Sequence, residues 1–219
     1  MDISQRFVES VKWSILLHGI YFALLFFAVM YESFFTMAII SIIGLLFSLY
    51  YLFFRSYKQE ELFLGSWVML ITVLHIGVTL GRVLEPATVI SIGVTVSVMD
   101  IISFTKKGKS TPNARAMANT NFASKLILYA ISPKDKHLIP AKGLGDFLFY
   151  SIWIAHCHLL AEGDWSYLLA GMIAIFIGTV VDWYIISKLY LRENYKGFPA
   201  TPIPFVCILS VIIIAMIKS

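Results

Sequence analysis

Charged residues are scarce in this sequence. Only 14% of its 219 residues are Asp, Glu, Lys or Arg, whereas about a quarter of a soluble globular domain is charged. The two cysteines, Cys157 and Cys207, both lie in apolar runs, which argues against a disulfide framework and a cysteine-based zinc site. Strict polar–apolar alternation is absent, which argues against a transmembrane β-barrel. Basic stretches interleaved with aromatic residues, typical of RNA-binding proteins, are also absent, so we expect no nucleic-acid partner.

Long apolar runs dominate instead, since 59% of the residues are hydrophobic. A helix that crosses a bilayer needs about 20 predominantly apolar residues. The first run is too long for the core of a signal peptide and no small-residue cleavage site follows, so we expect a retained span. The sequence predicts an all-α, multi-pass protein of the cell membrane, with a single transmembrane domain over residues 1–219. We expect about seven membrane-spanning helices, at 13–30, 34–54, 62–80, 86–104, 143–160, 165–187 and 202–217.

The distribution of Lys and Arg predicts the orientation. Fifteen of the 17 basic residues lie before the first predicted span or in the predicted loops after the second, fourth and sixth spans. Arg82 and Lys218 fall on the other side. Positively charged loops remain in the cytoplasm. We therefore expect a cytoplasmic N-terminus, a C-terminus outside, and a cytoplasmic loop at 105–141.

The second half of that loop has the pattern of a β-hairpin. Residues 126–131 form a short apolar run, residues 132–136 contain turn-forming Ser and Pro, and residues 137–140 can return as a strand. We expect this hairpin to lead into the fifth span. An interfacial helix over 122–131 is the alternative, because a short apolar run is compatible with either structure.

Two aspartates lie inside the apolar runs on either side of this loop. Asp100 precedes Lys106 by six residues and Asp146 follows Lys142 by four, which is about 9 Å and about 6 Å along a helix. Both therefore lie one to two turns below the cytoplasmic surface, and the antiparallel spans can bring them together. Carboxylates are costly in hydrocarbon and usually mark a functional site.

Such a pair predicts acid–base chemistry. Two carboxyl groups held close together cannot both ionise easily, so they share one proton. The ionised member can take a proton from water while the protonated member polarises a peptide carbonyl. Hydrolysis then needs neither a metal nor another cofactor. The pair titrates as a unit, so the sequence leaves open which aspartate is the base.

Two further segments fit such a site. Gly143, Leu144 and Gly145 immediately precede Asp146, and small residues allow close helix approach and leave the backbone accessible. The segment 198–205 contains three prolines, which prevent the last span from beginning early. An extended segment at membrane depth can offer its backbone to a substrate, although an ordinary proline-rich helix start is the alternative.

These segments resemble the presenilin and signal peptide peptidase family of intramembrane aspartyl proteases. Gly143-Leu144-Gly145-Asp146-Phe147-Leu148-Phe149-Tyr150-Ser151 is similar to the GxGD motif, and Pro199-Ala200-Thr201-Pro202 resembles the Pro-Ala-Leu-Pro element. The resemblance implies that Asp100 and Asp146 are catalytic. It also implies cleavage of transmembrane segments or signal peptides, with Gly143, Leu144, Gly145 and the residues from Pro199 to Pro202 in contact with the substrate. The substrate would unwind and add as a strand beside the segment preceding Gly143.

The chain also departs from that family. We expect seven spans where the family usually has nine, Met99 stands where an aromatic residue usually precedes the first aspartate, and Thr201 replaces the Leu of the proline element. Asp182, at the same predicted depth as Asp100, is a candidate third acid of the site. His156-Cys157-His158 lacks metal-ligand spacing on a helix, so we expect no metal site.

Three other functions fit parts of the pattern. A prepilin-type GxGD peptidase would cut a leader peptide just outside the membrane, but the proline element and the order of spans argue against it. A proton-coupled transporter or channel could relay protons through intramembrane acids, but the internal repeats typical of transporters are not visible. A catalytically silent membrane scaffold is the third. Oligomeric state and accessory subunits stay open.

Overall fold

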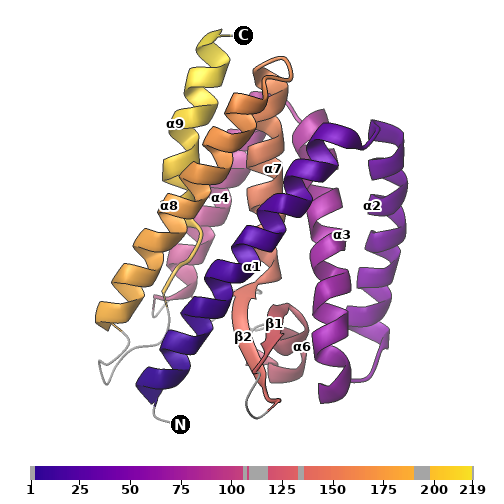
Figure 1. The fold of residues 1–219 in the computed structure, drawn as a ribbon, viewed down its shortest axis with the longest axis vertical. Coiled ribbons are helices and arrows are strands. Elements are labelled where there is room, and N and C mark those ends of the chain that lie inside the picture. Colours follow the sequence, from indigo (N-terminus) through magenta and orange to yellow (C-terminus); the bar gives the residue numbers. More distant parts are fainter. Residues whose placement is uncertain (1–2, 106–107, 109–117, 133–135, 190–197, 219) are drawn as a thin grey trace. The chain divides into compact units, whose positions relative to one another are not determined.

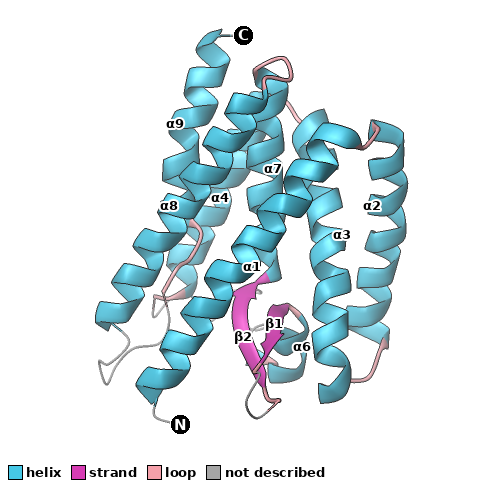
Figure 2. Cartoon of the chain, viewed as in Figure 1, coloured by secondary structure: helices cyan, strands magenta, loops and turns pink. Residues whose placement is uncertain are grey.

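The computed structural model describes all residues except 1–2, 106–107, 109–117, 133–135, 190–197 and 219, and most of the described backbone is helical (Figures 1 and 2). In chain order the elements are α1 Ile3–Tyr31, α2 Phe34–Leu49, η1 Tyr50–Phe54, η2 Gln59–Glu61, α3 Leu62–Val83, α4 Pro86–Ser103, α6 Thr120–Lys125, β1 Ile127–Ile131, β2 Leu138–Gly143, α7 Leu144–Leu160, α8 Trp165–Leu189 and α9 Pro202–Lys218.

The helices have the length and composition of an integral membrane protein. Among the described residues, five segments are long and apolar enough to cross a membrane: Phe7–Tyr31, Phe34–Phe54, Gln59–Val83, Pro86–Ser103 and Trp165–Leu189. The apolar helices α7 and α9 have 17 residues each, which is the lower end of the range for a span. The predicted all-α membrane architecture is thus confirmed at the level of long apolar helices.

The outward faces of these helices are apolar. On α2, for example, the exposed fractions of Phe35, Ile43 and Leu46 are 73%, 63% and 63%. A soluble protein rarely exposes a continuous apolar surface of this kind. Acyl chains can cover such faces, which is consistent with helices that lie in lipid.

Local sequence signals explain several helix ends. The Ser33 hydroxyl accepts a hydrogen bond from the Thr36 N–H and caps α2. Pro86 and Pro202 are the first residues of α4 and α9, where the missing N–H of proline costs nothing. The prediction that the prolines delay the last helix is confirmed, since Phe198 to Ala200 have no regular structure. In contrast, α1 begins ten residues before the predicted span at 13–30, because helix formation does not require an apolar sequence.

Backbone contacts divide the chain into two compact units. Unit 1 comprises Met1–Thr79 and Asn119–Ser151, and unit 2 comprises Leu80–Ala118 and Ile152–Ser219. The division falls within α3 and α7, so each of these helices contributes to both units. Asp146 belongs to unit 1, whereas Asp100 and Asp182 belong to unit 2.

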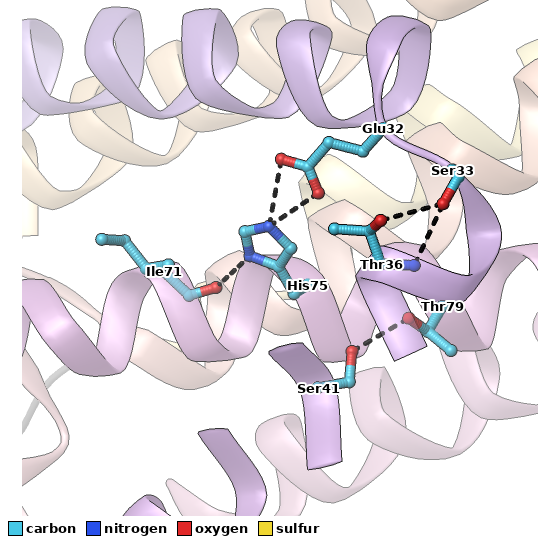
Figure 3. Close-up of polar contacts among 7 residues, drawn as sticks. All are labelled: Glu32, Ser33, Thr36, Ser41, Ile71, His75 and Thr79. Atoms are coloured by element: carbon cyan, nitrogen blue, oxygen red, sulfur yellow. Dashed lines mark hydrogen bonds and ion pairs between the residues drawn. The ribbon is translucent and has the colours of Figure 1, made fainter. Parts of the chain in front are cut away.

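Polar contacts join α1, α2 and α3 in unit 1 (Figure 3). The Ser41 and Thr79 hydroxyls lie 2.9 Å apart, which links α2 to α3. Nδ1 of His75 lies 2.7 Å from the Ile71 carbonyl oxygen, and its Nε2 lies 3.1 Å from Oε2 of Glu32. A carbonyl oxygen can only accept a hydrogen bond, so Nδ1 is the donor to Ile71. These contacts connect the end of α1 to the other two helices.

The predicted hairpin is present in unit 1. Strands β1 and β2 pair antiparallel, with Ile131 opposite Leu138 and Ile127 opposite Gly143, and the register shifts between Leu128 and Tyr129. Its predicted turn includes residues 133–135, which lie outside the described residues. The alternative helix over 122–131 is wrong beyond Lys125, since α6 ends there and β1 begins at Ile127. β2 runs directly into α7, which carries Asp146.

A buried lysine attaches α6 to the end of the second helix. The Lys125 ammonium donates to the carbonyl oxygens of Tyr51 (2.8 Å) and Arg55 (2.6 Å), and it lies 5.3 Å from the centre of the Tyr51 ring. Carbonyls at a helix C-terminus lack partners within the helix. Lys125 therefore satisfies the end of η1 and holds the segment that leads into the hairpin.

Candidate functional site

Asp146 lies at the junction between the hairpin and α7. β2 ends at Gly143, α7 begins at Leu144, and Asp146 is in the first turn of the helix. The Leu144 N–H donates to the Leu126 carbonyl oxygen across 2.8 Å, and the Leu144 side chain is buried. Leu144 thus anchors this junction, while the Asp146 side chain remains partly exposed.

Lys142 is the charged partner of this aspartate. Its Nζ lies 3.2 Å from Oδ2 of Asp146, and its side chain is only 8% exposed. The same ammonium lies 5.7 Å from the centre of the Tyr150 ring. The sequence indicated Lys142 only as a marker of the membrane surface. The signal for its local role is the four-residue spacing between the lysine and the aspartate.

Helix α1 holds the first turns of α7 in place. The buried Tyr21 hydroxyl donates to the Phe147 carbonyl oxygen (3.2 Å) and lies 2.8 Å from Oγ of Ser151. The His18 ring packs against Phe147 and Tyr150, with centroids 5.1 Å and 6.4 Å away. These contacts involve the residues that follow GxGD, and they fix the backbone that carries Asp146.

The two glycines of the motif have space around them. A Cβ atom added to Gly145 would meet nothing within 4 Å, and one added to Gly143 would lie 3.5 Å from Oδ2 of Asp146, an ordinary contact. Packing in this structure therefore does not require either glycine.

In unit 2, Asp100 is joined to the proline segment. Asp100 lies in the last turn of α4, and its Oδ2 accepts a hydrogen bond from the Thr201 N–H across 3.0 Å. Thr201 is buried, and Pro199 and Ala200 before it are partly exposed in irregular backbone. The first acid and the proline element, which the sequence predicts independently, are thus joined by a hydrogen bond.

Two glycines bring the start of α9 close to its neighbours. A Cβ atom on Gly178 of α8 would lie 2.5 Å from Cα of Pro204, and one on Gly93 of α4 would collide with the Phe205 ring. Such contacts leave no room for a larger residue. Sequence reasoning missed Gly93 and Gly178, although small residues in apolar helices are a general signal for close packing.

Asp182 is buried on α8. Only 1% of its surface is exposed, and it follows Gly178 by four residues, which places both on one helix face. That face packs against the start of α9, because Gly178 contacts Pro204 there. The structure therefore directs a third acid toward the helix that begins with the proline element.

Two other polar side chains form contacts within unit 2. Nδ1 of His156 lies 2.9 Å from the Gly81 carbonyl oxygen within unit 2. Oδ1 of Asp164 accepts a hydrogen bond from the Ser166 N–H (3.0 Å), which is the main reason that the pKa of Asp164 lies below its usual value. In the part of the chain that the structure describes, no three His, Cys, Asp or Glu side chains form a metal-binding group.

The predicted site residues are thus distributed between the units. Gly143, Gly145 and Asp146 lie in unit 1, whereas Asp100 and Thr201 lie in unit 2. The pairing of the two carboxyl groups stays a prediction. No known protein-family model matches the sequence.

Proposed function

We propose that this protein is an intramembrane aspartyl endopeptidase with Asp100 and Asp146 as its catalytic pair. The hydrogen bond between the Thr201 N–H and Asp100 carries the proposal. It joins the first acid to the proline element, as the resemblance to presenilin-type proteases implies. Asp146 supplies the second acid from the start of α7, in a setting with open space at Gly145.

The proposed substrate is a transmembrane segment or a signal peptide. The chain carries its acids on apolar helices, so a substrate that reaches them must itself be compatible with the bilayer. An unwound substrate could add as an extended strand beside β2, which ends three residues before Asp146. Pro199 to Pro202 would then orient the scissile peptide from the side of Asp100.

The proposed topology has seven spans, with α7 and α9 as the two shortest. Seventeen residues give a helix of about 26 Å, so both helices need a thin bilayer region or flanking polar residues that reach its surface. The excess of Lys and Arg in alternate loops supports a cytoplasmic N-terminus in the cell membrane. Water would then reach both acids from the cytoplasmic side.

One observation favours the runner-up, a proton-coupled transporter. Asp182 is almost fully buried in α8, and a chain of intramembrane acids is typical of proton relays. A protease needs only two acids for hydrolysis. A requirement for Asp182 in ion or solute flux, without peptide cleavage, would support the transporter.

The decisive experiment uses purified protein in proteoliposomes with a fluorescently labelled transmembrane peptide. We expect cleavage by the native protein and loss of cleavage in both Asp100→Asn and Asp146→Asn. Asp164→Asn is the matched control, because Asp164 is a partly exposed acid that follows the end of α7. Cleavage that survives in either Asn variant of the pair would overturn the proposal. The same vesicles, loaded with a pH-sensitive dye, report proton flux and test the transporter.

A further inference from the structure

The β-hairpin of unit 1 has two outer edges, and its ladder shows where they offer polar backbone groups. The Ser132 N–H donates to the His137 carbonyl oxygen across 2.9 Å. Hydrogen-bonded and non-hydrogen-bonded pairs alternate along an antiparallel ladder. The Tyr129–Pro140 pair lies three steps along the register from Ser132 and His137, so it is a non-hydrogen-bonded pair. Its backbone polar groups therefore point away from the partner strand on both sides of the hairpin.

Two helices of unit 1 bind these outward groups. The Tyr129 N–H donates to Oγ of Ser66 on α3 across 3.3 Å, and the Pro140 carbonyl oxygen accepts a hydrogen bond from Oγ of Ser10 on α1 across 2.7 Å. Helix α1 also packs against β2 (Figure 1). The edge of β1 is thus attached to α3, and the edge of β2 is attached to α1.

The two attachments differ in burial. At the edge of β1, Ser66 and Tyr129 are 1% and 7% exposed, and Lys125 ties the preceding segment to η1. At the edge of β2, Pro140 is exposed and Ser10 is half-buried, so water can reach their hydrogen bond. Local opening is easiest where backbone hydrogen bonds are exposed to solvent and few apolar contacts are buried. The edge of β2 is therefore the one that can open.

The part of α1 that covers this edge lies outside the apolar run. The helix begins ten residues before the predicted span, and residues 3–12 include the charged Arg6, Glu9 and Lys12. Such polar turns are compatible with water whether or not they contact β2. Residues 3–12 can therefore move away from the strand while the apolar part of α1 stays in the bilayer.

We propose that residues 3–12 are a displaceable cover, held by Ser10, over the outer edge of β2, and that an extended peptide segment takes their place. An uncovered strand edge is a template for another strand. The incoming strand must donate an N–H to the Pro140 carbonyl, as the Ser10 hydroxyl now donates its O–H. This inference rests on the proposed function, because the incoming strand is the proposed substrate, and it adds a step that precedes cleavage.

Removal of the Ser10 hydroxyl should make peptide binding tighter. A hydrogen bond between neutral groups shifts an equilibrium about twofold to tenfold, and the affinity of a site that is open part of the time rises with its open fraction. The probe is the fluorescently labelled transmembrane peptide, titrated onto protein that carries Asp100→Asn so that the peptide stays intact. We expect Ser10→Ala to bind it about twofold to tenfold more tightly.

Two variants control this measurement. Ser10→Thr keeps the hydroxyl group and should bind the peptide with the native affinity. Ser91→Ala is the matched control, because the exposed Ser91 hydroxyl donates to the Ala87 carbonyl oxygen of its own helix. It should also bind the peptide with the native affinity.

A second test follows the cover itself. Spin labels at Val8→Cys and Leu64→Cys, with both native cysteines replaced by Ala, report the distance between residues 3–12 and α3. The two positions are 48% and 69% exposed. In lipid nanodiscs, Ser10→Ala should raise the population with a displaced cover about twofold to tenfold, and the peptide should raise it without this substitution.

The outcomes separate the two proposals. Weaker or unchanged peptide binding in Ser10→Ala would overturn the cover, and it is the result expected if Ser10 only stabilises the fold. A label distance that the peptide leaves unchanged would overturn the cover as well. If the native protein cuts no peptide but both shifts occur, the protease function fails and the cover stands. If it cuts the peptide without these shifts, the cover alone fails.

Discussion

The Thr201 N–H donates a hydrogen bond to Oδ2 of Asp100 across 3.0 Å. The two residues are 101 positions apart in the sequence, and the contact joins the end of α4 to the start of α9. Pro202 follows immediately and begins α9. Thr201 is therefore the residue just before this helix, and its N–H group donates to a side chain outside the helix. The proline element thus presents a backbone donor to an acid.

Removal of this donor should impair cleavage. Thr201→Pro deletes the N–H group. A hydrogen bond contributes about 1 kcal/mol between neutral groups and about 1.5–3 kcal/mol when one group is charged. We therefore expect kcat/KM to fall about fivefold to a hundredfold in the peptide-cleavage assay. Thr201→Ala keeps the N–H and should retain at least about five times the activity of Thr201→Pro. Equal activities of the two variants would contradict this role of the N–H group.

Substitution of Gly145 should reduce activity without reducing stability. A Cβ atom there meets nothing within 4 Å, so Gly145→Ala should change the free energy of unfolding by no more than about 1 kcal/mol, the difference in helix propensity. The resemblance to presenilin-type proteases implies that Gly145 contacts the substrate, and displacement of a substrate by about 1 Å can cost about a hundredfold in rate.

The matched control for this prediction is Gly19→Ala. Gly19 lies in α1, and an added Cβ atom there also meets nothing within 4 Å. Both variants should unfold near the native midpoint in a denaturant titration in micelles, and only Gly145→Ala should lose cleavage. Full activity of Gly145→Ala would show that the open space is not used by the substrate.

Gly178→Ala should destabilise unit 2. The new methyl group would lie 2.5 Å from Cα of Pro204, and this backbone can yield only if α8 and α9 separate. Overpacking of this kind costs about 1–3 kcal/mol, which thermal unfolding followed by circular dichroism would detect. Gly171→Ala on the same helix is the control, because its Cβ would make ordinary contacts of 3.5–3.6 Å with Ile154. Similar midpoints for the two variants would argue against the close contact at Gly178.

Lys125→Met should destabilise unit 1. The substitution removes the ammonium group that donates hydrogen bonds to the Tyr51 and Arg55 carbonyl oxygens. Loss of charged hydrogen bonds costs about 1.5–3 kcal/mol, and the free energy of unfolding should fall by that amount in the denaturant titration. Lys58→Met removes an exposed ion pair and should cost less than about 1 kcal/mol. If both variants have the native stability, Lys125 does not hold η1 and α6 together.

Several parts of this fold could be predicted because their causes are local. The apolar runs predict spans that begin at 34, 86 and 202, and α2, α4 and α9 begin at these residues. The apolar stretch and following turn residues also predict the hairpin before Asp146. In each case the residues that set the boundary lie within a few positions of it, so the signal is present in the linear sequence.

Asp100, Asp146 and the proline element could likewise be selected as a candidate site, but the contacts of other residues could not. In the sequence, Lys125 and Lys142 are only positive charges of a cytoplasmic loop, whereas in the structure one is buried against η1 and the other pairs with Asp146. Gly93 and Gly178 were not predicted, although both allow α9 to approach α4 and α8.

Composition and residue order were thus sufficient to predict a set of apolar helices that fit a membrane, two of which carry an acid near one end. The tertiary structure alone decided which N–H group binds Asp100, which carbonyl groups Lys125 binds and which glycines lie at a helix contact. Those outcomes depend on distances between residues that are far apart in the chain, such as Asp100 and Thr201. Such distances follow from the packing of whole helices, and no local pattern encodes them.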